Sequence, residues 1–267
     1  MSHTNLQLLQ QKAAEANEYW ICPKTGIEMA VVPAGPFYFG AGSGIELESR
    51  AFSLARYPVT NAQWLGFIRD SQYSPAADQP QADEYLKHWA DESSPPKSEL
   101  NHPVVWISFI DALHYVDWAG LAIPSEWCWE KAARGTEGLS QPWGSGLFIW
   151  NFDSFVHVCQ DSTAAVDAYP DARTAFGCEQ MIGNVSEFCL SVEDIDEQQA
   201  QLDSGLWLPT PLPKQVAAES LIALRGSCYM RKDPARMICS HRRRLSAGRR
   251  NTWTGLRVAC SFDLKSM

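Results

Sequence analysis

The chain has 267 residues, of which 45% are hydrophobic and 20% are charged, enough for a sizeable core in one large or two small domains. No run of 18 apolar residues occurs, so we expect no membrane-spanning helix and no membrane insertion. The polar N-terminus lacks the apolar centre of a signal peptide, which predicts a cytoplasmic protein.

The N-terminal part of the chain predicts a first helix, a hairpin and one long loop. Residues 4–19 have a helix-forming composition and a partial apolar stripe, which predicts a short helix. Glu28–Gly40 reads as a β-hairpin with Pro33–Gly35 at its turn. Residues 71–101 are polar and rich in Pro, Asp and Glu, which predicts a loop or an insertion.

Three further helices are predicted, each preceded by a hydroxyl side chain that can cap the first turn. They cover residues 60–70, 108–119 and 125–134, with Thr60, Ser108 and Ser125 as the caps. After residue 134 the sequence predicts short strands and loops, including an acidic stretch at 193–203. Few helices, short strands and long irregular loops indicate an α+β fold of low regularity.

Positive charge gathers near the C-terminus of an otherwise acidic chain. The whole chain carries −9, yet residues 225–260 hold nine arginines and one lysine against the single acid Asp233. We expect most of these cations at the surface: Arg231, Lys232, Arg236, Arg242, Arg243, Arg244, Arg249 and Arg250. They either pair with the acidic loops at 78–99 and 193–203 or recruit an acidic partner. The negative net charge disfavours non-specific nucleic-acid binding.

Short phrases in a fixed order resemble one known family. They are Val31–Gly35, Tyr57–Trp64, His102–Val105, Trp118–Gly120, Pro124–Gly135, Pro142–Gly144, Ala175–Gly177, Met181–Phe188, Leu224–Ser227 and Gly255–Val258. The set resembles the formylglycine-generating enzyme (sulfatase-modifying factor) domain. The resemblance implies a C-type-lectin-like fold over residues 27–261, preceded by an N-terminal helix and lead-in at 1–26.

The sequence differs from this family at the positions of the catalytic cysteines. Catalytic members hold copper between two cysteine thiolates, a donor type that soft Cu(I) requires. The resemblance places those cysteines near Met230 and Ala235, and neither is a cysteine. The eight cysteines show no C-x-x-C pair, and we expect most to be buried thiols. A rearranged pair of Cys228 and Cys239 would be needed for an oxidase.

One short motif resembles a motif of the family that lies near a calcium site in some members. Asn184 and Glu187 match that motif, and oxygen ligands of this kind suit Ca²⁺. The alternative is that Asn184 ties a turn and Glu187 bonds to the backbone. No other cofactor is expected, because the six histidines show no metal-ligand spacing.

Residues 228–254 also resemble the variable stretch of the retroelement-diversified proteins that share this fold. These variable proteins of diversity-generating retroelements keep the fold constant and change the ligand. By this resemblance the contact residues are Tyr229, Met230, Arg231, Lys232, Arg236, His241, Arg243, Arg249 and Trp253. The resemblance implies binding of a protein or other macromolecular ligand, and the arginines of the segment predict that this ligand is acidic. A neighbouring repeat of the coding segment with adenine-specific differences would establish diversification.

Two other functions remain open from the sequence. One is a copper-dependent oxidase with relocated cysteines, and the other is an accessory or scaffold domain in a signalling or secretion assembly. The loss of both family cysteines favours a binding protein over an enzyme.

Overall fold

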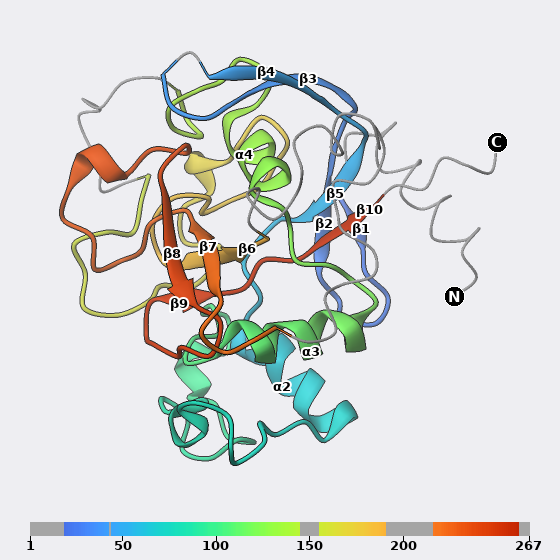
Figure 1. Cartoon of the computed structure of the whole chain (residues 1–267), viewed down its shortest axis with the longest axis vertical. Helices are drawn as coiled ribbons and strands as arrows, with labels where there is room; N and C mark the ends of the chain where they lie inside the picture. Colours follow the sequence, from blue (N-terminus) through green and yellow to red (C-terminus); the bar gives the residue numbers. More distant parts are fainter. Residues whose placement is uncertain (1–18, 43, 145–154, 191–215, 262–267) are drawn as a thin grey trace.

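The computed structural model describes residues 19–42, 44–144, 155–190 and 216–261 (Figure 1). The predicted helix at 4–19 and the acidic stretch at 193–203 therefore lie outside the described residues. Within them the fold is α+β, with three α-helices, three small sheets and long connections. None of the helices described is both long and apolar enough to cross a membrane.

The first sheet brings the two ends of the described chain together. Its strand order is β1-β2-β5-β10, and all three pairings are antiparallel. The strands are β1 (Trp20–Ile21), β2 (Glu28–Val32), β5 (Phe52–Ala55) and β10 (Ala259–Ser261). The edge strand β10 thus pairs with a strand some two hundred residues earlier in the sequence, which closes the domain.

The predicted hairpin over Glu28–Gly40 is wrong. Strand β2 pairs with β1 and β5, whereas β3 (Gly35–Phe39) leaves the first sheet and pairs with β4 (Ile45–Ser49). Gly35, at φ +125, adopts a backbone conformation that favours glycine at this corner. The buried Lys131 Nζ donates to the carbonyls of Pro33 and Gly35, 2.7 and 3.0 Å away, and so holds the corner from a distant helix.

The three predicted helices are confirmed, with the predicted caps. They are α2 (Asn61–Ser71), α3 (Phe109–Ala119) and α4 (Glu126–Arg134). The Thr60 and Ser108 side chains accept hydrogen bonds from the backbone of the third helical residue, and each helix returns a side-chain bond to the cap. Ser125 caps α4 through a single hydrogen bond that its side chain accepts from Cys128 N at 3.2 Å.

Helices α2 and α3 pack through aromatic rings at one end of the molecule (Figure 1). Trp64 stacks on Tyr115 with ring centroids 5.0 Å apart, and Phe67 meets both rings edge-on. The predicted loop at 71–101 contains only two short 3-10 turns, Ala82–Glu84 and Lys97–Glu99. It covers this cluster with buried aromatic side chains.

Arg250 fixes this long loop to the core, contrary to its predicted exposure. Its guanidinium is buried and bonds both carboxylate oxygens of Asp111, at 2.9 and 2.8 Å. The remaining donors reach the Pro80 carbonyl and the Gln79 side chain in the loop. Burying a charged group is costly unless it is paired and hydrogen-bonded. These partners allow Arg250 to be buried instead of lying at the surface.

The third sheet has the order β8-β7-β6-β9 and carries the C-terminal basic segment. Its strands are β6 (Ser186–Cys189), β7 (Leu221–Arg225), β8 (Arg242–Ser246) and β9 (Thr254–Gly255). Strand β8 pairs with β7 and lies at the edge of the sheet, and β9 runs parallel to β6. The interval 228–254 therefore leaves at the end of β7, returns along an edge strand and ends at β9.

Replacing Arg250 with methionine is expected to destabilise the protein by about 3–5 kcal/mol, because Asp111 would remain buried without its counter-charge. Urea unfolding of Arg250→Met, Asp111→Asn and the double variant measures the effect. The double variant should lose less stability than the sum of the two single changes. Additive losses would show that the pair is not coupled.

Stability is also expected to fall as the pH drops from about 6.5 to about 4. His88 Nε2 accepts a hydrogen bond from Trp89 Nε1 at 3.0 Å, and burial lowers the pKa of His88 to about 4. Within this window the unfolded chain binds a proton that the folded chain does not, which costs up to about 3 kcal/mol. His88→Gln should flatten the dependence of the unfolding free energy on pH between pH 6.5 and about 4, and an unchanged dependence would contradict the assignment to His88.

Candidate ligand-binding surface

A buried ion network sets the position at which the basic segment begins. Arg225, the last residue of β7, donates to Glu126 Oε1 at 3.2 Å and to Glu130, both from α4. Its third partner is the Cys239 carbonyl at 2.9 Å. Arg225 is buried and both glutamates are fully buried, and these carboxylates raise the pKa of the guanidinium despite its burial.

A second buried pair fixes the other end of the segment. Arg257 Nε and Nη2 bond the two oxygens of Glu187, at 2.9 and 2.8 Å, and Trp129 Nε1 donates to the same carboxylate at 2.6 Å. Arg257 also donates to three backbone carbonyls, including Ala55 and Glu179. We refer to Glu126, Glu130, Glu187, Arg225 and Arg257 together as the buried frame.

Asn184 ties the start of the segment to its neighbours. It adopts φ +56, and its side chain exchanges hydrogen bonds with the Ala164 backbone and donates to Gln180. Its carbonyl accepts from Tyr229 N at 2.9 Å. Gly226, at φ +92, passes so close to Met181 that an added Cβ would lie 2.9 Å from its carbonyl oxygen. These contacts leave one path for the chain between β7 and residue 229.

Residues 157–160 form an unpredicted wall beside the segment. Cys159 N donates to the Arg231 carbonyl at 3.2 Å, and Gln160 N donates to the Tyr229 carbonyl at 3.0 Å. Cys159 is the exposed cysteine, whereas the other seven are buried, as expected for most of them. No spacing or motif in the sequence indicates this pairing, because it joins two irregular stretches distant in the chain.

The structure brings four of the predicted contact residues into one basic cluster, defined here as Arg231, Arg236, His241 and Arg243. Burial, then the cations of Arg231, Arg236 and Arg243, lower the pKa of His241. Burial and the cations of Arg231 and Arg236 likewise lower the pKa of Arg243. These like charges lie near enough to disfavour one another.

The basic cluster has little internal compensation. Arg236 pairs with Asp233 at 3.0 Å, with both side chains about half exposed. Within the described ranges no carboxylate forms an ion pair with Arg231 or Arg243. Arg231 Nε and His241 Nε2 are shielded from solvent yet have no hydrogen-bond partner among the described residues. The cluster thus carries positive charge that the described carboxylates only partly balance.

Of the remaining predicted contact residues, some are exposed at the surface and others are buried beneath it. Met230 is 51% exposed, and Lys232 and Arg249 are exposed as well. Trp253 is half-buried beneath Arg243, whose guanidinium lies 4.7 Å from the ring centroid. Tyr229 is buried, and its hydroxyl bonds Thr252 at 3.0 Å, so it supports the surface from below.

The described residues do not fit the copper centre of the family. At the positions corresponding to its cysteines stand Met230 and Ala235, both exposed. Cys228 and Cys239 are buried, and burial raises the pKa of both thiols. A copper thiolate site needs the deprotonated form, which this environment disfavours.

The two side chains of the predicted calcium motif, Asn184 and Glu187, already bond other residues of the protein. Glu187 bonds the side chains of Arg257 and Trp129, rather than the backbone, and Asn184 bonds residues on two neighbouring turns. No group of three or more His, Cys, Asp or Glu residues able to hold a metal occurs in the described part of the chain. Calcium at this motif stays a prediction.

A model of the sulfatase-modifying factor enzyme 1-like domain family matches residues 20–262. The chain belongs to this family. Serine/threonine-protein kinase Pkn1 of Chlamydia trachomatis serovar L2 is 30% identical over 254 residues, which cover 89% of this chain and 38% of the kinase. The chain therefore spans well under half of that relative.

Two solved structures share the fold of this sulfatase-modifying-factor domain. PvdO from Pseudomonas aeruginosa has a TM-score of 0.67 at 20% identity, covering 92% of this chain and 98% of that one. Treponema denticola variable protein 1 has a TM-score of 0.61 at 14% identity, covering 91% and 98%. Together with the three small sheets, these neighbours establish the C-type-lectin-like architecture that the sequence resemblance implied.

Cu(I) is expected to show no tight one-to-one binding to the reduced protein, since Cys228 and Cys239 are buried thiols with raised pKa values. Competition with a chromophoric chelator measures it on the wild type and on Cys228→Ser. Tight binding that disappears in the variant would contradict this expectation and restore the oxidase alternative.

Proposed function

We propose that this domain is a binding module that holds an acidic macromolecular ligand on the surface formed by residues 228–254. The observation that carries the proposal is the basic cluster. Burial and the neighbouring cations of Arg231 and Arg236 lower the pKa values of His241 and Arg243, and Arg231 and Arg243 have no ion pair among the described residues. An anionic ligand would relieve this repulsion by forming charge-assisted hydrogen bonds with the guanidinium groups.

The surroundings of the cluster support a macromolecular ligand. Met230 and Trp253 add an adaptable apolar contact and an aromatic ring next to the cations, side-chain types that suit protein recognition. Lys232 and Arg249 extend the exposed positive charge beyond the cluster. A small anion would use only part of this surface, whereas an acidic protein segment can contact the cations and the apolar side chains together.

The contrast between frame and surface supports a diversified role for the segment. The buried frame fixes both ends of 228–254, while Met230, Lys232, Arg236 and Arg249 project outward with few bonds to the rest of the protein. Substitutions at such exposed positions cost little stability. This division suits a variable protein of a diversity-generating retroelement, and we include that role in the proposal.

The proposal predicts that a labelled hexaglutamate peptide binds more tightly than hexaglutamine, with an affinity that falls as salt is added. Removing two cations in Arg231→Ala/Arg243→Ala should weaken binding by about tenfold or more, because charge-assisted hydrogen bonds are lost. Fluorescence anisotropy measures both peptides at two salt concentrations.

The matched control is Lys87→Ala/Lys97→Ala, which removes the same charge from exposed sites on the loop at 71–101. It should change the affinity by less than about twofold. Equal losses in the two double variants would mean that only net charge matters, and equal binding of the two peptides would rule out an acidic ligand.

A further inference from the structure

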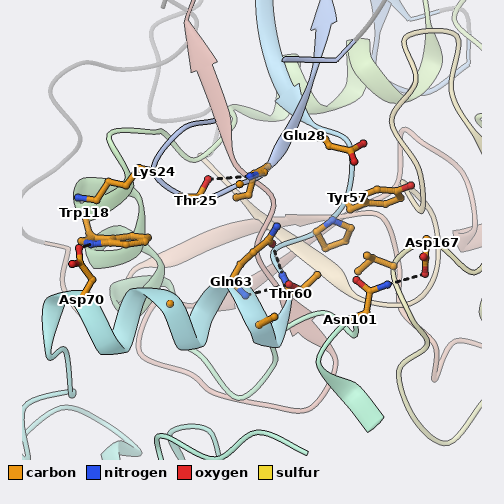
Figure 2. Close-up of a pocket in the computed structure, with 16 residues that line it drawn as sticks. Lys24, Thr25, Glu28, Tyr57, Thr60, Gln63, Asp70, Asn101, Trp118 and Asp167 are labelled. Atoms are coloured by element: carbon orange, nitrogen blue, oxygen red, sulfur yellow. Dashed lines mark hydrogen bonds between the residues drawn. The ribbon is translucent and has the colours of Figure 1, made fainter. Parts of the chain in front are cut away.

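A second surface lies along the outer face of α2, away from the segment 228–254. It is an open groove of about 930 Å³, and Figure 2 shows the side chains that line it. The turn between β1 and β2, helix α2, Trp118 at the end of α3, and loop residues near 57, 101 and 167 form its walls. None of its lining residues comes from 228–254, so it is independent of the proposed function.

One end of the groove already binds a cation of the chain itself. Lys24 Nζ lies 4.7 Å from the centroid of the Trp118 ring. The indole Nε1 of Trp118 donates to Asp70 Oδ2 at 2.6 Å, which places a carboxylate at the rim of the ring (Figure 2). An aromatic face with a neighbouring carboxylate is a favourable environment for an ammonium or guanidinium group. Lys24 is exposed, so a competing cation can displace it.

The rest of the groove is acidic and polar. Asp167 lies at the opposite end, where it accepts from Asn101 Nδ2 at 2.9 Å, and Glu28 lies above the middle (Figure 2). Glu28 forms an ion pair with Arg56, which is not among the lining residues, and is 38% exposed at its side chain. Asp70 and Asp167, which form no ion pair with a described residue, thus face the groove against the single lysine, whereas the charge of Glu28 is balanced by Arg56.

The floor of the groove is low because small residues lie on the outer face of α2. Ala62 and Gly66 are exposed and one helical turn apart, with Gln63 beside them. Gly66 is an unfavourable residue inside a helix, and a Cβ added to it would meet nothing within 4 Å. The missing side chain leaves space at the centre of the groove.

We propose that this groove binds an extended basic segment of a protein partner, in which one lysine or arginine replaces Lys24 on Trp118 beside Asp70. A second cation, further along the same segment, reaches the Asp167 end. A chain with spaced cations can contact both carboxylate ends, whereas a single small amine contacts one of them. The open floor at Gly66 allows the peptide backbone to lie close to the helix.

A labelled peptide of alternating lysine and alanine tests the proposal, with the matching glutamate peptide and free spermidine as comparisons. Lys24→Ala should tighten binding of the lysine peptide by roughly threefold, because the internal competitor is removed. Asp70→Asn should weaken it by about fivefold, and Gly66→Gln, which fills the floor, by about tenfold.

Two controls separate binding from folding and from net charge. Gly66→Gln replaces glycine with a better helix former, so its thermal midpoint should equal or exceed that of the wild type. Asp78→Asn removes an exposed acid outside the groove and should change the affinity by less than about twofold. The variant Arg231→Ala/Arg243→Ala should bind the lysine peptide at least as well as the wild type, so this result is read separately from that of the proposed function.

Three outcomes would overturn the proposal. They are weaker binding in Lys24→Ala, unchanged binding in Gly66→Gln, and equal losses in Asp70→Asn and Asp78→Asn. Spermidine that binds as tightly as the lysine peptide, with the same response to the variants, would replace the peptide with a small organic cation.

Discussion

The ion network between Arg225 and the two glutamates of α4 is the interaction on which the rest of the structure depends. It joins β7 to the buried helix α4 and, through the Cys239 carbonyl, also holds the middle of the segment 228–254. Removing one member of such a network leaves an uncompensated buried charge, at a cost of about 3–5 kcal/mol. The network therefore fixes the position of the end of β7, where the segment 228–254 begins. The position of the surface formed by those residues depends on it.

Arginine has two opposite uses in this domain. Arg225, Arg250 and Arg257 are buried and bond carboxylates through forked geometry, so they act as fixed joints between distant parts of the chain. Arg231 and Arg243 lie where cations crowd one another and pair with no described carboxylate. The first group stabilises the fold, whereas the second raises its electrostatic energy, and a ligand of opposite charge would lower that energy.

Local rules predicted what is locally determined. Thr60, Ser108 and Ser125 cap their helices because a hydroxyl and the first-turn amides lie within a few residues of one another. The hairpin at Glu28–Gly40 failed because its corner is held by Lys131, about a hundred residues away. Arg250 was expected at the surface because its carboxylate partner, Asp111, is also more than a hundred residues away in the sequence. Neither the Lys131 contact nor the Arg250 ion pair can be recognised from the spacing of residues.

The two candidate surfaces also differ in how far they can be recognised from the sequence. The basic segment was visible in the sequence because its cations are contiguous, although only the fold shows which of them crowd together. The groove along α2 was not visible, because Lys24, Asp70 and Trp118 come from three separate elements. Its one local trace is Gly66, a helix-disfavouring residue at an exposed position with space above it. The packing of α2 does not require a glycine at this position, and the proposed peptide is a partner that would use the space.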